Sequence, residues 1–250
     1  MKDRLELNSE AISMRKHFGA DDSSPIHIFS LLGHSDYITL VLYPMGKRFA
    51  GMSVRVGENG LIAVNSGMSY GRQRLSCAHG LYHLYHQELC KRAVCLQDLE
   101  TDDPHEMEAN RFASYFIAPY EALREFIYKR LEKNKGEFLT DDVVRIEQYF
   151  GFSRQAVLKR LLEEDYLTLS QTKTMMAGAA EQAARLGFDP SLYAPSPKDK
   201  SYQTFGKYIQ LAEELKSKEL ISTGKYEELM LSAFRSDMVF GGEGDDDLND

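Results

Sequence analysis

Two histidines four residues apart, His79 and His83, are the side chains whose types and spacing most directly indicate chemistry. On a helix this spacing places both imidazoles on one face, where they can bind a single metal ion. The corresponding helix of many metallopeptidases reads H-E-x-x-H, and its glutamate is the general base of the reaction. Gly80 stands at the position of that glutamate. The pattern therefore predicts a metal-binding helix without its catalytic carboxylate.

A carboxylate on a second helix commonly supplies the third ligand of such a site. Residues 105–118 are predicted to form that helix, because apolar side chains recur there at helical spacing and Pro119 follows. The small and aromatic residues of the repeating face are Ala109, Phe112, Ala113 and Phe116. Glu106 and Glu108 lie at the beginning of this helix, so both acids are available to the metal by position alone.

The same residues also have interpretations that need no metal. His79 and His83 can be core histidines that are hydrogen-bonded to the backbone. Glu106 can be a solvated acid in the first turn of a helix, where the helix dipole favours a negative charge. We expect Glu108 to be a solvated surface acid of this kind.

Other polar side chains of the histidine helix are expected to have structural roles. His86 lies seven residues after His79 on the same face, and we expect it to pack or to support a ligand rather than to bind the metal. Tyr82 and Tyr85 are expected to be core aromatics, although a tyrosine near the metal can also orient a substrate.

The elements upstream of this helix must hold it in place. Residues 8–18 and a segment that begins near Pro25 are predicted to be helices. Three short β-rich runs separated by turn residues then predict a small three-stranded sheet. These runs are 37–43, 50–56 and 61–65, and the histidine helix follows at about 69–87.

The chain downstream is predicted to be helical. One helix should run from Tyr120 to about Asn134, and residues 140–170 have the form of a helix-turn-helix. Acidic residues outnumber basic ones in this segment, so a packing module is favoured over a DNA reader. A proline-containing linker then leads to further helices within 201–240.

Composition limits the class of protein. The chain has 250 residues, 43% of them hydrophobic, which is enough for one large domain or two small ones. We find no apolar run that could span a bilayer and no apolar secretory segment, so a cytoplasmic protein without membrane contact is expected. The three cysteines, Cys77, Cys90 and Cys95, form no C-x-x-C pair and are expected to be reduced thiols.

The net charge of −8 is concentrated near the end of the chain. Acids after Arg235 are not opposed by any Lys or Arg, and residues 241–250 are expected to be a disordered acidic tail. The remainder is nearly balanced in charge. It offers no general basic surplus for the phosphates of nucleic acid, so direct binding to nucleic acid is not expected.

Two longer motifs resemble the ImmA/IrrE family of metallopeptidases. Members carry R-Q-R-F-[ST]-x-A-H-E-x-x-H, and residues 72–83 read R-Q-R-L-S-C-A-H-G-L-Y-H. Members also carry E-x-x-A-[ND]-x-F-A-x-x-[LF]-x-x-P, which residues 106–119 match. Residues 24–29, 62–65 and 151–161 resemble the segments that flank these motifs, so the resemblance covers about residues 8–230.

The resemblance implies an α+β fold with a zincin-like metallopeptidase core, made of the small sheet and the active-site helices. This core is expected at 1–136, followed by a helical region at 137–240 with its helix-turn-helix-like segment at 140–170. Zn²⁺ is implied as the cofactor. His79, His83 and Glu106 match the ligands of the family, and a water is expected in the open fourth position.

Three functions are compatible with these observations. The first is a zinc endopeptidase that acts on a repressor-like regulator, as the resemblance implies, and that is inactive or very slow because Gly80 replaces the general base. The second is a pseudo-enzyme that binds such a partner protein without cutting it. The third, which the acidic balance disfavours, is a DNA-binding regulator. Gly80→Glu is expected to restore the motif and with it peptidase activity.

Overall fold

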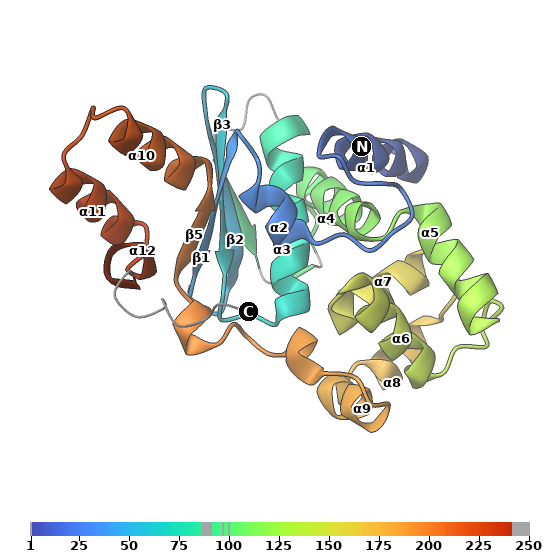
Figure 1. The fold of residues 1–250 in the computed structure, drawn as a ribbon. Helices are drawn as coiled ribbons and strands as arrows, with labels where there is room; N and C mark the ends of the chain where they lie inside the picture. The colour runs from blue at the N-terminus through green and yellow to red at the C-terminus, as the bar shows by residue number, and fades with distance from the viewer. Residues whose placement is uncertain (1, 87–91, 97, 100, 242–250) are drawn as a thin grey trace.

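The computed structural model describes residues 2–86, 92–96, 98–99 and 101–241. The tail expected at 241–250 lies outside these residues except for Gly241, and Cys90 lies outside them as well. The described chain is a mixed α+β structure, as the sequence predicts (Figure 1). None of its described helices combines the length and the apolar character needed to cross a membrane.

A five-stranded sheet with the order β4-β2-β3-β1-β5 forms the centre. Its strands are β1 (Ile38–Tyr43), β2 (Phe49–Val56), β3 (Asn59–Asn65), β4 (Arg92–Leu96) and β5 (Gln203–Gly206). β1 and β3 are parallel, and the other neighbouring pairs are antiparallel.

The expectation of three strands is too low, because the sheet also contains β4 and β5. Each is short, with five residues in β4 and four in β5. Their partners, β2 and β1, lie far away in the sequence, so no hairpin turn marks them. The three predicted runs correspond to β1, β2 and β3.

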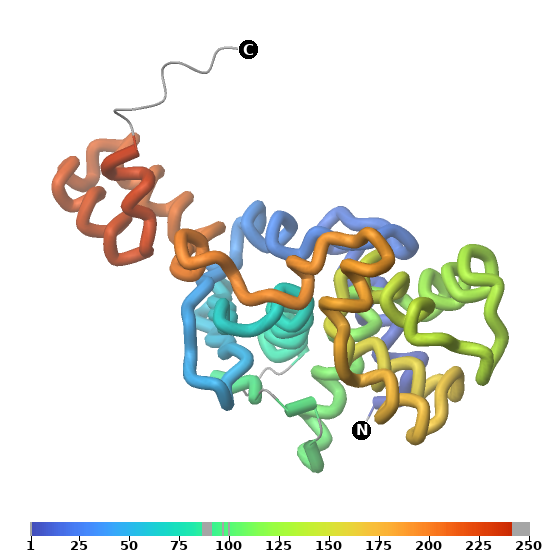
Figure 2. Tube along the Cα trace, turned by 90° about the horizontal axis from the view of Figure 1, so that it is seen from below, coloured from blue at the N-terminus to red at the C-terminus, as the bar shows by residue number. Residues whose placement is uncertain are grey.

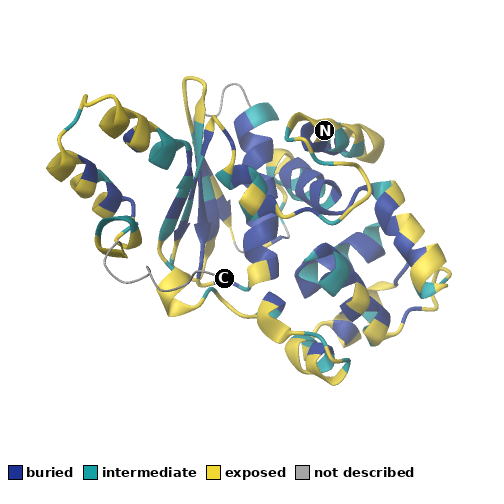
Figure 3. Cartoon of the chain, viewed as in Figure 1, coloured by how far each residue is buried: buried dark blue, intermediate teal, exposed yellow. Residues whose placement is uncertain are grey.

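Helix α3 (Tyr70–His86) crosses one face of the sheet and is covered on its other side by α4 (Pro104–Ile117) (Figure 1). It is buried along most of its length (Figure 3). Asp103 caps α4 by accepting a hydrogen bond from the His105 amide, and Pro104 occupies the first turn. The predicted apolar face of α4 is completely buried, which explains the close packing of the two helices.

Two N-terminal helices complete this side of the sheet. α1 (Arg4–His17) packs on α4, and α2 (Ile28–Gly33) lies against β1 and α3. Asp3 caps α1 by accepting from the Glu6 amide. Both helices were predicted, although α1 begins four residues earlier than the predicted range; α2 begins at Ile28, near Pro25 as expected.

The downstream helices gather at one end of the molecule (Figures 1 and 2). The single helix predicted from Tyr120 is instead α5 (Tyr120–Glu125) continued by a π-helical turn at Phe126–Leu131. The two helices predicted within the helix-turn-helix-like segment are α6 (Thr140–Phe150) and α7 (Arg154–Glu163). Two short helices follow, α8 (Leu169–Met175) and α9 (Ala179–Arg185).

The last part of the chain returns to the sheet. After 3₁₀ turns at Pro190–Tyr193 and Lys198–Lys200, β5 pairs with β1. α10 (Lys207–Ser217), α11 (Thr223–Ser232) and α12 (Asp237–Phe240) then gather at the opposite end from α6–α9, around a small core of their own (Figure 2). β5 comes from the region expected at 137–240, yet it joins the sheet of the core. The boundary after residue 136 remains a prediction.

Candidate metal centre

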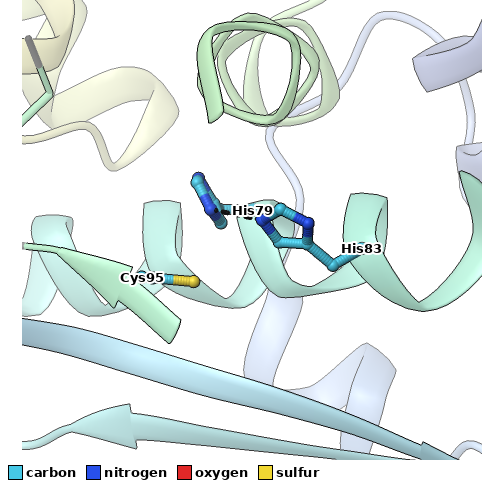
Figure 4. A group of neighbouring side chains, drawn as sticks. All are labelled: His79, His83 and Cys95. Carbon is cyan, nitrogen blue, oxygen red and sulfur yellow. Dashed lines mark hydrogen bonds between the residues drawn. The ribbon is translucent and has the colours of Figure 1, made fainter. Parts of the chain in front are cut away.

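The facing surfaces of α3 and α4 bring the three predicted ligands together. His79 Nε2 and His83 Nε2 lie 2.8 Å apart. Glu106 places Oε2 at 3.2 Å from His79 Nε2 and Oε1 at 3.2 Å from His83 Nε2. The histidine residues are only 5% and 3% exposed, whereas the Glu106 side chain is 25% exposed, so the cluster is buried on the histidine side and partly open at Glu106. Figure 4 shows the two imidazoles projecting from adjacent turns of α3.

Asn110 fixes the tautomer of His79. His79 Nδ1 lies 3.0 Å from Asn110 Oδ1, and an amide oxygen can only accept a hydrogen bond, so Nδ1 is the donor. The amide is itself oriented, because Asn110 Nδ2 donates to the Leu99 carbonyl at 3.4 Å. In the neutral ring, Nε2 is therefore left with a lone pair directed at Glu106 and His83.

The protonation states of His79 and Glu106 favour the binding of a cation. Burial lowers the pKa of His79 by more than the neighbouring Glu106 raises it. Burial alone would raise the pKa of Glu106, but its hydrogen bonds with His79 and His83 outweigh burial and hold that pKa well below its usual range. Two imidazole nitrogens and two carboxylate oxygens thus converge on one point, and a metal ion that displaces the proton from Nε2 can bind all of them. This donor set fits a metal.

Gly80 lies on the side of α3 that faces the sheet. A Cβ built on Gly80 would be 3.1 Å from Ile62 Cγ2 and 3.4 Å from Ile62 Cγ1. Both are side-chain atoms, so a larger residue would require Ile62 to move by a few tenths of an ångström. Position 80 therefore has no side chain of its own and little space for one.

Cys95 is a potential donor that the sequence analysis did not assign to the site. Its thiol projects from β4 towards the two imidazoles (Figure 4). The donor atoms of His79, His83 and Cys95 all lie within 4.8 Å of one another, and all three residues are buried. Burial raises the pKa of the Cys95 thiol. The one signal in the sequence was the alternation of β4, which directs Ala93 and Cys95 to the same face.

Glu108 is not a surface acid, and that expectation is wrong. It is buried, since Tyr82 donates to its Oε2 at 2.6 Å and the Lys2 amide donates to its Oε1 at 2.6 Å. The N-terminal segment before α1 covers this part of α4, which a local sequence pattern does not reveal. Glu108 therefore binds Tyr82 and the N-terminus.

His86 packs as expected. Its ring stacks on Tyr82 with centroids 5.0 Å apart, and Phe112 lies 5.3 Å from it. Its Nδ1 lies 3.6 Å from Glu10 Oε2. Tyr82 is a buried core aromatic, as predicted, and Tyr85 is partly buried against the same core.

The residues that precede the histidines fasten α3 to its surroundings, a role that the sequence analysis did not identify. Arg72 Nη2 donates to the Leu96 carbonyl at 3.0 Å and so ties α3 to β4. Gln73 Nε2 donates to the Met68 carbonyl at 2.7 Å. Arg74 donates to the carbonyls of Ile26, Phe150 and Gly151, which join α3 to the segment before α2 and to the α6–α7 turn.

Arg145 of the helix-turn-helix-like segment is exposed, whereas the other three basic side chains are used within the fold. Arg154 forms a buried ion pair with Glu147. Lys159 Nζ donates to the Leu99 carbonyl at 2.6 Å, and Arg160 pairs with Glu164. These contacts support the prediction of a packing module.

Comparison with known proteins identifies a family for most of this region. The model of one protein family, Peptidase_M78, described as the IrrE N-terminal-like domain, matches residues 26–162. This range is more than half of the chain, and it includes the histidine helix, α4 and the α6–α7 pair. No curated protein matches the sequence.

Proposed function

The chain belongs to the family of IrrE N-terminal-like peptidase domains, and from this premise we propose that it is a zinc-binding member that recognises a repressor-like regulatory protein and cleaves it very slowly or not at all. It is a metallopeptidase-type protein, and its family implies a metal. Zinc suits a set of two imidazoles and a carboxylate, and it would supply the Lewis acidity that polarises a peptide carbonyl.

The observation that carries the proposal is the glycine beside a converged set of ligands. His79 Nε2 and His83 Nε2 each lie 3.2 Å from an oxygen of Glu106, whereas Gly80 has no group that can accept a proton. Losing a positioned general base commonly costs about 10²- to 10⁴-fold in rate. Glu108 does not replace it, because its carboxylate is held by Tyr82 and the Lys2 amide.

The edge of the sheet supports recognition of an extended peptide. Among the described strands, β4 pairs with β2 on one side and lies at the edge. A groove of about 710 Å³ beside it is lined by Arg48, Phe49, Leu96, Asp98 and Gln155. Phe49 and Leu96 are partly exposed there. An added peptide strand would gain backbone hydrogen bonds from β4 and apolar contacts from this groove.

Metal content tests the first half of the proposal. The unaltered chain should retain about one zinc per chain after dialysis, and His83→Ala should lose it. His86→Ala is the matched control, because His86 lies on the same helix but packs against Tyr82. A His83→Ala variant that keeps a full equivalent of zinc would show that the ligand assignment is wrong.

Binding and cleavage assays test the second half. Repressor-like proteins of the same genome are mixed with the zinc-loaded chain, and complex formation and peptide fragments are measured together. We expect a complex without fragments. Rapid, chelator-sensitive fragmentation by the unaltered chain would contradict the proposal, since it would require a general base other than the missing glutamate.

A further inference from the structure

We infer that Cys95 is a fourth ligand of the metal, so that the site is closed by His79, His83, Glu106 and the Cys95 thiolate instead of being open to a substrate. This inference rests on the proposed function, because it assumes that the histidines bind a metal. It replaces the water expected from the sequence in the fourth position. The zinc then has a structural role.

The geometry places the thiol within reach. In a tetrahedral zinc site, Zn–S and Zn–N bonds of about 2.3 Å and 2.0 Å put the sulfur about 3.5 Å from each nitrogen. The Cys95 Sγ and the two imidazole nitrogens already lie within 4.8 Å of one another. These separations exceed those of a zinc site by at most about 1.3 Å.

The fold holds Cys95 at this point. The ladder between β2 and β4 is irregular between Phe49 and Gly51, opposite Leu96 and Cys95. An irregularity of this kind re-aims the side chains beside it. The bond from Arg72 to the Leu96 carbonyl fastens the next residue of β4 to α3, the helix that carries both histidines. The pairing of β4 with β2 and the hydrogen bond from Arg72 therefore both position the thiol relative to the imidazoles.

The balance of charge favours the fourth ligand. Two neutral imidazoles and one carboxylate leave one positive charge on a Zn²⁺ ion, and a thiolate cancels it. His79, His83 and Cys95 are all buried, where an uncompensated charge is costly. Thiolates are also preferred ligands of zinc, and metal binding displaces the thiol proton.

The missing general base at Gly80 and the added ligand at Cys95 both favour a structural metal over a catalytic one. Catalytic zinc sites keep one position free, whereas structural sites use four protein ligands. Without a general base, a water in a free position would be activated only slowly for hydrolysis. With Cys95 bound, the metal would join α3, α4 and β4, and its binding energy would add to the stability of the fold.

Cobalt substitution provides the test, because cobalt bound by a thiolate has a charge-transfer absorption in the near ultraviolet. The full-length chain should bind about one Co²⁺ with this absorption. Cys95→Ala should lose the absorption and bind zinc at least about tenfold more weakly in competition with a chelator. Cys77→Ala is the matched control, since Cys77 is equally buried but does not belong to the cluster. Cys90→Ala completes the set, and both controls should resemble the unaltered chain.

The outcomes separate this inference from the proposed function. One equivalent of bound cobalt without a thiolate absorption would overturn the role of Cys95 and leave the zinc proposal intact. Failure of the unaltered chain to bind any metal would overturn both. If Cys95→Ala does not fold, X-ray absorption of the zinc-loaded unaltered chain decides instead, because a sulfur ligand gives a shell at about 2.3 Å. Absence of that shell would overturn the inference.

Discussion

At the scale of the residue, Asn110 orients one predicted ligand of the candidate metal centre without being a ligand itself. Its amide oxygen accepts the Nδ1 proton of His79, which leaves Nε2 free to bind the proposed metal. Partners of this kind typically contribute 10- to 100-fold to metal affinity. Asn110→Ala should weaken zinc binding by about that factor, measured by chelator competition at pH 7. Asn110→Asp keeps an acceptor and should stay closer to the unaltered chain. Equal zinc affinities of the unaltered chain, Asn110→Ala and Asn110→Asp would contradict this role.

Gly80 stands where the family motif has its general-base glutamate, and the proposed lack of activity rests on this residue. The sequence predicts that Gly80→Glu restores activity, but two neighbours oppose the single change. A Cβ at position 80 approaches Ile62 Cγ2 to 3.1 Å, and the proposed thiolate of Cys95 fills the position that a substrate would need.

We therefore expect Gly80→Glu alone to remain inactive and Gly80→Glu combined with Cys95→Ala to gain metal-dependent cleavage of the repressor-like partner. The gain should be part of the factor of about 10²–10⁴ that a general base supplies. Mass spectrometry of the partner, with and without a chelator, measures it. Full activity of the single variant would show that Cys95 does not close the site.

At the scale of the element, Arg74 connects α3 to two distant parts of the chain. It donates to the carbonyls of Ile26, Phe150 and Gly151, and it is itself buried. Removing the guanidinium leaves buried carbonyls unpaired, at about 1–3 kcal/mol each. Arg74→Ala should therefore lower the melting temperature by about 6 °C or more.

The control for this prediction is Arg124→Ala. Arg124 forms an exposed ion pair with Glu121, so its loss should change the free energy of unfolding by less than about 0.5 kcal/mol. Thermal unfolding of both variants, followed by circular dichroism, gives the comparison. Similar melting temperatures for the two variants would show that Arg74 does not hold the elements together.

At the scale of the whole molecule, the C-terminal region contributes differently through its strand and through its helices. β5 covers the edge of β1 with antiparallel pairing over Thr39–Leu42. α10, α11 and α12 pack mainly around their own core. Loss of the strand should expose an edge that can pair with other chains, whereas loss of the helices should leave the sheet closed.

Two truncations separate these contributions. A chain that ends at Gly206 keeps β5 and should retain about one zinc and a folded sheet. A chain that ends at Lys200 loses β5 and should aggregate. Light scattering and zinc analysis of the two proteins measure the difference. Aggregation of both to the same extent would show that the helices, and not the strand, protect the sheet.

The sequence by itself determined the local parts of this protein. Helix geometry places His79 and His83 on one face because they are four residues apart, and the apolar face of α4 follows from the period of its apolar residues. Both could therefore be predicted without a structure. The two motifs identified the family, which the matched residues 26–162 confirm. These predictions succeeded because the interactions that decide them lie within one helix or one short motif.

Only the tertiary structure decided which distant side chains meet. The pairing of β4 with β2 brings Cys95 to the histidines, and the N-terminal segment buries Glu108 against Tyr82. The pairing of β5 with β1 adds a strand from the far end of the chain. Such contacts depend on packing between elements that are far apart in the sequence, and five residues of β4 carry no local signal of their partner. For this reason the fourth donor of the site became visible only in the folded chain.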